Sequence, residues 1–376
     1  MKTINFAIVR QKYRHDGGAE KFITYAIEAL AILKMINLNI ITRQWWCKQD
    51  INLNIHLCNP IKWGRISRER SFAKIAKALW HKEGFDLIQS HERIPGCDIY
   101  RAGDGVHQKW LIQRSRVLSK WQQKLLFTSC YHRYVIKTEN TMYTSPELKV
   151  VICNSQMIKK EIIEQFTISE YKIHVIYNAI NTKTFFPANY YQRINIRKTL
   201  HLPLDVHLLI YVGSGFERKG LAAAIHAIAN TNSYLVVIGQ DKAEKKYRIL
   251  AKKLCCAHRI IFAGIQVKMC PWYQASDGLL LPTLYDPCPN VIFEALACGL
   301  PIITSTSCGG SEFISPGING YICDALDIDA LTDAILALTL SNNDAQISNY
   351  SRAQVIPLSS KLLSQQLISL YQKILE

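Results

Sequence analysis

Apolar runs of strand length alternate with helical patterns along most of the chain. In the first half, the apolar runs predict strands at 4–9, 38–41, 51–57, 86–88 and 150–153. The helical periodicity between them predicts helices at 19–33, 72–80 and 155–166. Short, almost uninterrupted apolar strands separated by helices are typical of parallel sheets that helices cover on both faces. The first half therefore predicts a doubly wound α/β domain.

The same alternation starts again in the second half. Strands are predicted at 207–212, 234–238, 260–263, 278–281 and 301–304. Helices are predicted near 219–230, 243–254, 291–298 and 327–340.

The polar stretch 178–187 separates the two series and ends at a proline, so we interpret it as a linker. The sequence thus predicts two Rossmann-like domains that face each other across a cleft, residues 1–183 and 184–357. A helix over 358–376 is a candidate to pack back on the first domain. In such folds, ligands bind beyond the carboxyl ends of the strands.

Composition adds a charge asymmetry to this picture. The 376 residues are 49% hydrophobic and 20% charged, with a formal net charge of +16, which excludes a disordered or fibrous chain. Residues 1–187 hold 29 basic and 15 acidic side chains, whereas residues 188–376 hold 16 and 14. The first half is therefore predicted to meet an anionic partner.

The twelve cysteines include no C-x-x-C pair, which argues against a zinc site or a disulfide framework and favours reduced core residues. The first residues have no signal-peptide pattern, and no apolar stretch reaches the length of about 18 residues that a membrane helix needs. We therefore expect a cytoplasmic protein without a membrane span.

Two glycine-containing segments are candidates to bind phosphate. Gly17 and Gly18 open a predicted helix, where backbone N–H groups can approach an anion, although a plain Gly-Gly turn is the alternative. The segment Gly213–Gly220 follows a predicted strand and fits neither the dinucleotide fingerprint nor the P-loop. Its Arg218 and Lys219 stand at a helix start and oppose the helix dipole, so a diphosphate site is favoured over a solvated pair.

The segment after the strand at 278–281 carries acids. Asp286 begins a proline-interrupted loop, Asn290 is predicted to cap the next helix, and Glu294 lies among apolar residues of that helix. A carboxylate in such surroundings needs a partner, and ligand hydroxyls could provide it. The alternative is a capped helix with a surface glutamate.

Residues 90–105 gather a histidine, acids and glycines in two turns beyond a strand. A carboxylate or imidazole there could act as a general base or bind hydroxyls. For His91 alone, a satisfied structural role is the alternative.

Together these segments resemble a known family. Gly17-Gly18-Ala-Glu, Arg218-Lys219-Gly, and Asp286 with Glu294 eight residues later are similar to motifs of the retaining nucleotide-sugar glycosyltransferases of family four, which have the GT-B fold. The closer similarity is to the lipopolysaccharide core glucosyltransferases of Gram-negative bacteria. It rests on three segments: Pro95–Tyr100 with Asp104, Gly213–Gly220, and Val237–Lys242.

The resemblance implies roles for the donor-binding residues. Gly17 and Gly18 would lie near the donor diphosphate, and Arg218 with Lys219 would neutralise it. In the loop and helix that follow, Asn290 would belong to the donor site and Glu294 would hold the donor ribose.

The resemblance also implies three catalytic candidates, Asp104, Asp286 and His91. Asp286 would contact the transferred sugar, but the family usually has glutamate there, which leaves the identity of the donor sugar open. Asp104 stands where close relatives carry a candidate base for the acceptor hydroxyl, and His91 loosely matches a sugar-contacting histidine.

Transfer of a sugar from a nucleoside diphosphate develops negative charge on the departing diphosphate. Arg218 and Lys219 could stabilise that charge, so we predict transfer without a metal or other cofactor. The pair Asp327 and Asp329 resembles a metal-binding D-x-D motif, but it lies at a helix start and is predicted to cap that helix.

Residues 107–127 hold five cations, no acid and two tryptophans. Trp110, Val117, Trp121 and Leu125 recur at helical spacing, which predicts one amphipathic helix that can lie on an anionic membrane. An ordinary helix with its tryptophans in the core is the alternative.

The sequence therefore favours an enzyme that moves glucose from UDP-glucose to a lipid-linked lipopolysaccharide core saccharide at the inner face of the cytoplasmic membrane. A donor such as GDP-mannose or UDP-N-acetylglucosamine is an alternative. A basic nucleic-acid-binding protein is another, although no nucleic-acid-binding motif supports it.

Overall fold

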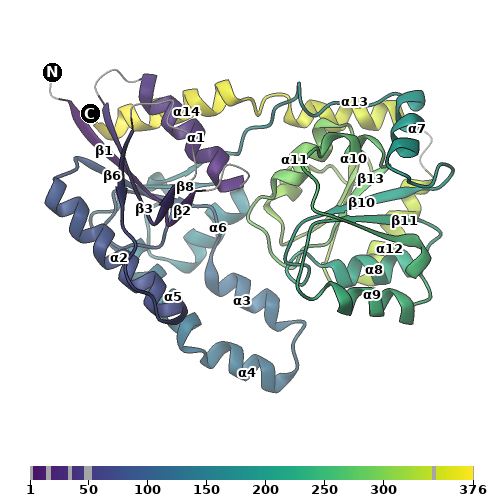
Figure 1. The fold of residues 1–376 in the computed structure, drawn as a ribbon, viewed down its shortest axis with the longest axis horizontal. Coiled ribbons are helices and arrows are strands. Elements are labelled where there is room, and N and C mark those ends of the chain that lie inside the picture. The colour runs from purple at the N-terminus through teal and green to yellow at the C-terminus, as the bar shows by residue number, and fades with distance from the viewer. Residues whose placement is uncertain (1–2, 14–17, 33–35, 46–52, 341–343, 376) are drawn as a thin grey trace. The chain divides into compact units, whose positions relative to one another are not determined.

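The computed structural model describes residues 3–13, 18–32, 36–45, 53–340 and 344–375 (Figure 1). The chain divides into two compact units. Unit 1 comprises Met1–Ala179 and Ser360–Glu376, and unit 2 comprises Ile180–Ser359. The predicted domain boundary after residue 183 lies close to this division.

Unit 1 is built on a seven-stranded parallel sheet with the order β5-β3-β1-β6-β7-β8-β9. Its strands are β1 (Ile4–Val9), β3 (Ile36–Thr42), β5 (Asn54–Leu57), β6 (Leu87–Ser90), β7 (Ile99–Ala102), β8 (Val150–Cys153) and β9 (Ile173–Val175). A separate parallel pair consists of β2 (Lys12–Tyr13) and β4 (Gln44–Trp45). The helices are α1 (Gly18–Ile32), α2 (Gly64–Glu83), α3 (His107–Ser115), α4 (Lys120–Thr128), α5 (Cys130–Tyr143), α6 (Gln156–Gln165) and α14 (Ser360–Leu375).

Unit 2 repeats this architecture with six parallel strands in the order β12-β11-β10-β13-β14-β15. Its strands are β10 (Leu208–Val212), β11 (Tyr234–Ile238), β12 (Ile260–Gly264), β13 (Gly278–Leu281), β14 (Ile302–Ser305) and β15 (Gly320–Cys323). The helices are α7 (Tyr190–Thr199), α8 (Leu221–Ala229), α9 (Glu244–Lys253), α10 (Cys270–Gln274), α11 (Asn290–Ala297), α12 (Ile328–Thr339) and α13 (Asp344–Val355). Short 3₁₀ turns lie at Glu170–Lys172, Ala257–Arg259 and Gly309–Phe313.

The two sheets confirm the predicted fold class of two Rossmann-like α/β domains. Strands β8, β10, β13 and β14 are buried along their whole length, as strands covered on both faces must be. In both sheets the strand order reverses direction once, between β1 and β6 in unit 1 and between β10 and β13 in unit 2. Loops at the carboxyl ends of these strands frame the position where doubly wound folds bind ligands.

The last helix belongs to the core of unit 1. Leu363, Leu367 and Tyr371 of α14 are buried in one cluster with the apolar residues of α1 and β1. Figure 1 shows α1 and α14 side by side, and the Tyr371 hydroxyl donates to Gln89 Oε1 at 2.6 Å. The chain therefore completes its first unit with its final residues.

The predicted linker 178–187 is held mainly by unit 2. Arg352 of α13 donates to the carbonyl oxygens of Phe185 and Thr182, each at 3.0 Å. Among the described residues, no helix is long and apolar enough to cross a membrane. The cysteines that the structure describes are free thiols.

Two local predictions are wrong. Residues 107–127 do not form one helix, because α3 ends at Ser115 and α4 begins at Lys120. Ser119 starts α4 with extended backbone angles, and Gln122 Oε1 accepts from its backbone N–H at 3.0 Å, which fixes a new helix start. The segment 90–105 is not two continuous turns, because it contains the buried strand β7.

Candidate functional site

The loops that follow β10 and β13 meet at the point of unit 2 where the strand order reverses. Gly220 joins the first loop to α8 with φ of 76°, and a side chain there would collide with the carbonyl oxygen of Pro282. The carbonyl oxygen of Arg218 accepts from Leu284 N at 2.8 Å and from Thr283 Oγ1 at 2.9 Å. The two loops are therefore locked together, and glycine at position 220 permits their close approach.

This contact brings together three of the residues that the sequence singled out. Lys219 Nζ lies 2.7 Å from Asp286 Oδ2, and Arg218 NH1 lies 3.0 Å from the same oxygen. The side chains of Lys219 and Asp286 are 9% and 8% exposed, whereas that of Arg218 is 40% exposed. The cluster is thus a buried ion pair with a second, accessible cation at its rim.

The electrostatics of the cluster keep Asp286 ionised. Burial opposes ionisation, but the charges and hydrogen bonds of Lys219 and Arg218 outweigh it and lower the pKa of Asp286 below its usual value. The guanidinium of Arg218 has five N–H donors, more than its contacts with Asp286 and the carbonyl oxygen of Tyr285 use. The cluster can therefore offer positive charge to an anion bound at the rim.

Glu294 lies in α11, the helix after the Asp286 loop, and is 9% exposed. Its Oε2 accepts from the Tyr273 hydroxyl at 2.9 Å. Tyr273 therefore supplies a partner for the carboxylate, which the sequence analysis expected from ligand hydroxyls.

The predicted capping role of Asn290 is wrong. Asn290 is the first residue of α11, and Pro289 holds the cap position. Asn290 nevertheless lies at the helix start that follows Asp286.

His91 follows β6 and is buried, 6% exposed. Its Nε2 lies 3.0 Å from Gln89 Nε2, and Gln89 Oε1 accepts from Tyr371. Because the amide nitrogen donates, His91 Nε2 accepts and its ring proton lies on Nδ1. Burial, together with the charges of Arg10 and Arg101, places the pKa of His91 well below its usual value. The ring is thus a neutral member of a network that joins β6 to α14.

Asp104 lies beyond β7, and its side chain is 66% exposed. Its Oδ2 lies 3.6 Å from Arg93 NH1, while Arg93 Nε donates to buried Glu139 at 2.7 Å. Glu139 also accepts from the backbone N–H of His107. Arg93 therefore links the start of α3, helix α5 and the accessible carboxylate of Asp104.

Of the glycine pair Gly17 and Gly18, Gly18 begins α1, whereas Gly17 lies outside the described residues.

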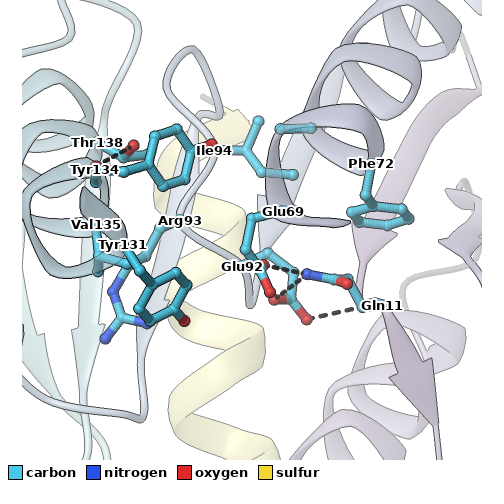
Figure 2. Close-up of a pocket in the computed structure, with 11 residues that line it drawn as sticks. Gln11, Glu69, Phe72, Glu92, Arg93, Ile94, Tyr131, Tyr134, Val135 and Thr138 are labelled. Atoms are coloured by element: carbon cyan, nitrogen blue, oxygen red, sulfur yellow. Dashed lines mark hydrogen bonds between the residues drawn. The ribbon is translucent and has the colours of Figure 1, made fainter. Parts of the chain in front are cut away.

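A pocket of about 40 Å³ lies at the corresponding switch point of unit 1, and sequence reasoning missed it (Figure 2). Gln11 follows β1 and Glu92 follows β6, while Glu69 projects from α2. The backbone N–H of Gln11 donates to Glu92 Oε1 at 2.9 Å, and its side-chain amide bridges Glu69 Oε2 at 2.5 Å and Glu92 Oε2 at 3.3 Å. Tyr131 of α5 stands at its side in Figure 2. Amide, carboxylate and phenol groups of this kind bind hydroxyls.

The sequence contained little signal for this pocket. Glu92 lies in the segment 90–105, but Glu69 and Tyr131 come from helices distant in the chain.

Among the residues that the structure describes, no group of three or more His, Cys, Asp or Glu is arranged to hold a metal ion. The predicted capping by Asp327 is confirmed, because its Oδ1 accepts from Ala330 N at 3.0 Å.

Helices α3 and α4 present apolar side chains to solvent. Trp121 and Leu125 of α4 are 65% and 60% exposed, and Val117 between the helices is also exposed. Trp110, predicted on the same face, is instead half-buried in α3. Core packing of Trp121 is thereby excluded.

Comparison with protein families gives two matches in series. Residues 16–184 match the Glycosyltransferase Family 4 model, and residues 192–354 match the model of Glycosyl transferases group 1. The two matches correspond to the first part of unit 1 and to unit 2.

Characterised and uncharacterised relatives share parts of the sequence. The chain is 28% identical over 331 residues to the lipopolysaccharide core biosynthesis glycosyltransferase LpsE of Rhizobium meliloti, covering 87% of each chain. It is 25% identical to the lipopolysaccharide glucosyltransferase WaaG of Escherichia coli, covering 63% of each. It is 29% identical to an uncharacterized glycosyltransferase of Methanocaldococcus jannaschii, covering 45% of each. The last two matches span less than two thirds of the relatives' length.

Solved structures share the fold over nearly the whole chain. The crystal structure of WaaG superimposes with a TM-score of 0.81 at 19% identity, covering 97% of this chain and 99% of WaaG. HepE of Anabaena, solved in complex with UDP and glucose, superimposes with a TM-score of 0.73 at 16% identity, covering 98% and 100%.

Proposed function

Because the chain is a GT-B glycosyltransferase related to the lipopolysaccharide core glucosyltransferases, we propose that it transfers glucose from UDP-glucose to a lipopolysaccharide core saccharide with retention of anomeric configuration. The observation that carries this proposal is the cluster of Arg218, Lys219 and Asp286 at the switch point of unit 2. Similarity to LpsE and WaaG supports the class of acceptor, and the UDP and glucose bound by HepE support the class of donor.

The cluster can perform the electrostatic part of the reaction. Cleavage of the bond between the sugar and the diphosphate leaves negative charge on the diphosphate. Arg218 and Lys219 would share their charge between Asp286 and that leaving group, and each strong donor of this kind lowers a barrier by about 3 kcal/mol. Both cations contact Oδ2 of Asp286, so its Oδ1 can accept from a hydroxyl of the transferred sugar. We propose that this arrangement works without a metal ion.

The remaining donor contacts are proposed from the resemblance to the family. Gly17 and Gly18 would approach the diphosphate at the start of α1. Glu294 would accept from the ribose hydroxyls while keeping its bond to Tyr273, and Asn290 would flank them at the start of α11.

Asp104 of unit 1 is an accessible carboxylate. Asp104 is exposed and held by Arg93, so it is our candidate to receive the proton of the acceptor hydroxyl. His91 is buried, neutral and bonded to Gln89, which favours a structural or sugar-positioning role over proton transfer.

We further propose that the enzyme works as a peripheral protein on the inner face of the cytoplasmic membrane. The support is an exposed apolar row, formed by Trp121 and Leu125 of α4 and by Val117 between α3 and α4. Arg116, Lys120 and Lys124 flank this row. Tryptophan at the headgroup boundary with cations around it is typical of interfacial helices. A lipid-linked saccharide would then be presented to unit 1.

The decisive experiment measures donor hydrolysis and transfer with UDP-glucose, GDP-mannose and UDP-N-acetylglucosamine, each with and without a chelator. We expect UDP-glucose to be turned over fastest and the chelator to leave the rate unchanged. Faster turnover of another donor would replace the donor assignment, and loss of activity that magnesium or manganese restores would disprove metal independence. No turnover of any donor, with tight salt-dependent DNA binding, would favour a nucleic-acid-binding protein.

A further inference from the structure

A second exposed apolar segment lies in unit 1, outside the residues 107–127. The loop between β5 and α2 carries Ile61 and Trp63, which are 81% and 84% exposed, with Lys62 between them. Tryptophan is a largely buried residue type in folded proteins, and leaving two large apolar side chains in water costs free energy. Such an exposure is typical of a contact surface.

The loop is held in this position by a buried residue. Arg43 is 4% exposed, and its NH1 donates to Asn59 Oδ1 at 3.3 Å and to the carbonyl oxygen of Pro60 at 3.1 Å. Its NH2 donates to the carbonyl oxygen of Arg68 at 2.5 Å. On the other side of the loop, the backbone N–H of Trp63 donates to Ser67 Oγ at 3.2 Å. Both ends of the loop are therefore fixed, and its apolar tip is displayed rather than frayed.

The charge around the tip has one sign. Residues 61–70 contain four cations and one acid, and that acid, Glu69, pairs with Arg68 at 2.9 Å and lines the pocket. The first turn of α2 has no acid, and Trp63 at its cap position makes no side-chain capping bond. Cations at a helix start oppose the helix dipole, an arrangement that an external anion relieves.

The start of α2, directly after the loop, contacts α5, the helix that follows α4. Arg65 stacks over the ring of Tyr131 at 3.8 Å, and Tyr131 belongs to the first turn of α5, which follows α4 after Ser129. Trp63 is two residues from Arg65, a separation of at most about 7 Å. Packing of α5 against both α2 and α4 makes the loop and the exposed row of α4 parts of one region of unit 1 (Figure 1).

We propose that the loop 61–63 is a second membrane-insertion element, which enters the headgroup layer of an anionic bilayer together with α4. This inference rests on the proposed membrane association and adds a second point of contact. Two separated contacts fix the tilt of unit 1 on the surface, whereas one amphipathic helix leaves it free to roll. The charge argues for a bilayer over a second copy of the chain, because a symmetric contact through this region would place like charges together.

The test compares binding of the full chain to vesicles of phosphatidylglycerol and phosphatidylethanolamine. Ile61→Ser with Trp63→Ser should weaken binding about tenfold, because two apolar side chains no longer leave water. Val267→Ser is the matched control, since Val267 is 96% exposed beside a lysine but lies in unit 2. Brominated lipids should quench a component of the tryptophan fluorescence that is absent in Trp63→Phe. Urea unfolding should be unchanged, because the replaced side chains are exposed.

The outcomes separate this inference from the proposed function. Normal binding of the loop variant, combined with weak binding of Trp121→Ser, would disprove the loop contact and leave membrane association intact. If the parent protein itself does not bind the vesicles, both ideas fail, whereas donor turnover is tested separately. Self-association in sedimentation velocity that the loop substitutions abolish would assign the loop to a dimer and overturn the proposal.

Discussion

Units 1 and 2 share one architecture but distribute charge in opposite ways. Unit 1 holds 30 basic and 16 acidic side chains, whereas unit 2 holds 15 and 13. In unit 2 the cations that the sequence singled out are turned toward a buried acid, with Lys219 and Arg218 both on Asp286. In unit 1 the cations of α4 and of the loop 61–63 lie exposed beside exposed apolar side chains.

The difference shows that the net charge of a unit and the charge of a local cluster suit different anionic partners. A compact diphosphate needs a few cations, desolvated and held at short distance, so a nearly neutral domain can bind it. An extended anionic surface is met by many exposed cations, each of which contributes little and is screened by salt. The excess of basic side chains in unit 1 therefore indicates an extended anionic partner that contacts a whole face of the unit.

The largest effect is expected for the cluster of unit 2. Lys219→Ala should reduce glucose transfer by about a hundredfold to a thousandfold, because one strong donor to the leaving diphosphate is lost. Glu294→Ala should give a loss of similar order by removing the ribose contact. The measurement is the initial rate of transfer from UDP-glucose.

Lys245→Ala is the control for this prediction, because Lys245 is an exposed lysine of α9 in the same unit. Near-normal rates for both site variants, with Lys245→Ala equally active, would disprove the assignment of the donor site to unit 2.

A smaller effect is expected for the surface cations of unit 1. Replacement of Arg114, Arg116, Lys120 and Lys124 by glutamine should weaken binding to anionic vesicles about tenfold to a hundredfold, since each cation near such a surface contributes up to about 1 kcal/mol. Hydrolysis of UDP-glucose in the absence of membrane should be unchanged.

Replacement of four other exposed lysines of unit 1 provides a control with the same change in net charge: Lys74, Lys82, Lys160 and Lys373. Equal weakening by both sets would mean that total charge, rather than the face of α3 and α4, sets the affinity.

The smallest effect sharpens the comparison inside unit 1. His107 Nε2 lies 2.9 Å from His132 Nδ1, and burial, followed by the charge of Arg93, lowers the pKa of His107 to about 3. A lowered folded-state pKa gives stability above pH 6.5 that is lost as the pH falls toward 3, because the unfolded chain takes up the proton first.

When the pH falls from 7 to 5, the parent protein should lose more unfolding free energy than His107→Gln. The expected difference between the two losses is about 1 kcal/mol, after allowance for the partial exposure of the ring. Urea unfolding at the two pH values measures this difference. His81→Gln, at an exposed histidine of α2, should retain the pH dependence of the parent. An identical dependence for His107→Gln would show that burial and the charge of Arg93 do not lower the pKa of His107 in the folded protein.

The apolar runs along the sequence predicted most of the strands that form the two sheets. The predicted strands at 4–9, 150–153, 234–238 and 278–281 agree with the observed ends, because a buried parallel strand must be apolar on both faces. The short edge strands β9 and β15 lacked that signal and were not predicted. The break at Ser119 was missed because the apolar spacing of α3 and α4 continues across it, whereas the hydrogen bonds at the Ser119 backbone do not.

The candidate site of unit 2 could also be predicted from the sequence, since Arg218, Lys219, Asp286 and Glu294 lie in short segments that follow strands. Their partners were not readable. Tyr273 for Glu294, Gln89 for His91 and Arg93 for Asp104 are set by packing between elements.

By itself, the sequence determined two Rossmann-like domains, an uneven charge and the segments that we propose bind phosphate, because each of these depends on residues close together along the chain. Only the tertiary structure decided that Lys219 and Arg218 share one carboxylate oxygen, that α14 completes unit 1, and that Gln11, Glu69 and Glu92 form a pocket. It also decided that Trp63 and Trp121 face solvent. Burial and partnership depend on which distant elements pack together, and apolar periodicity does not specify that choice.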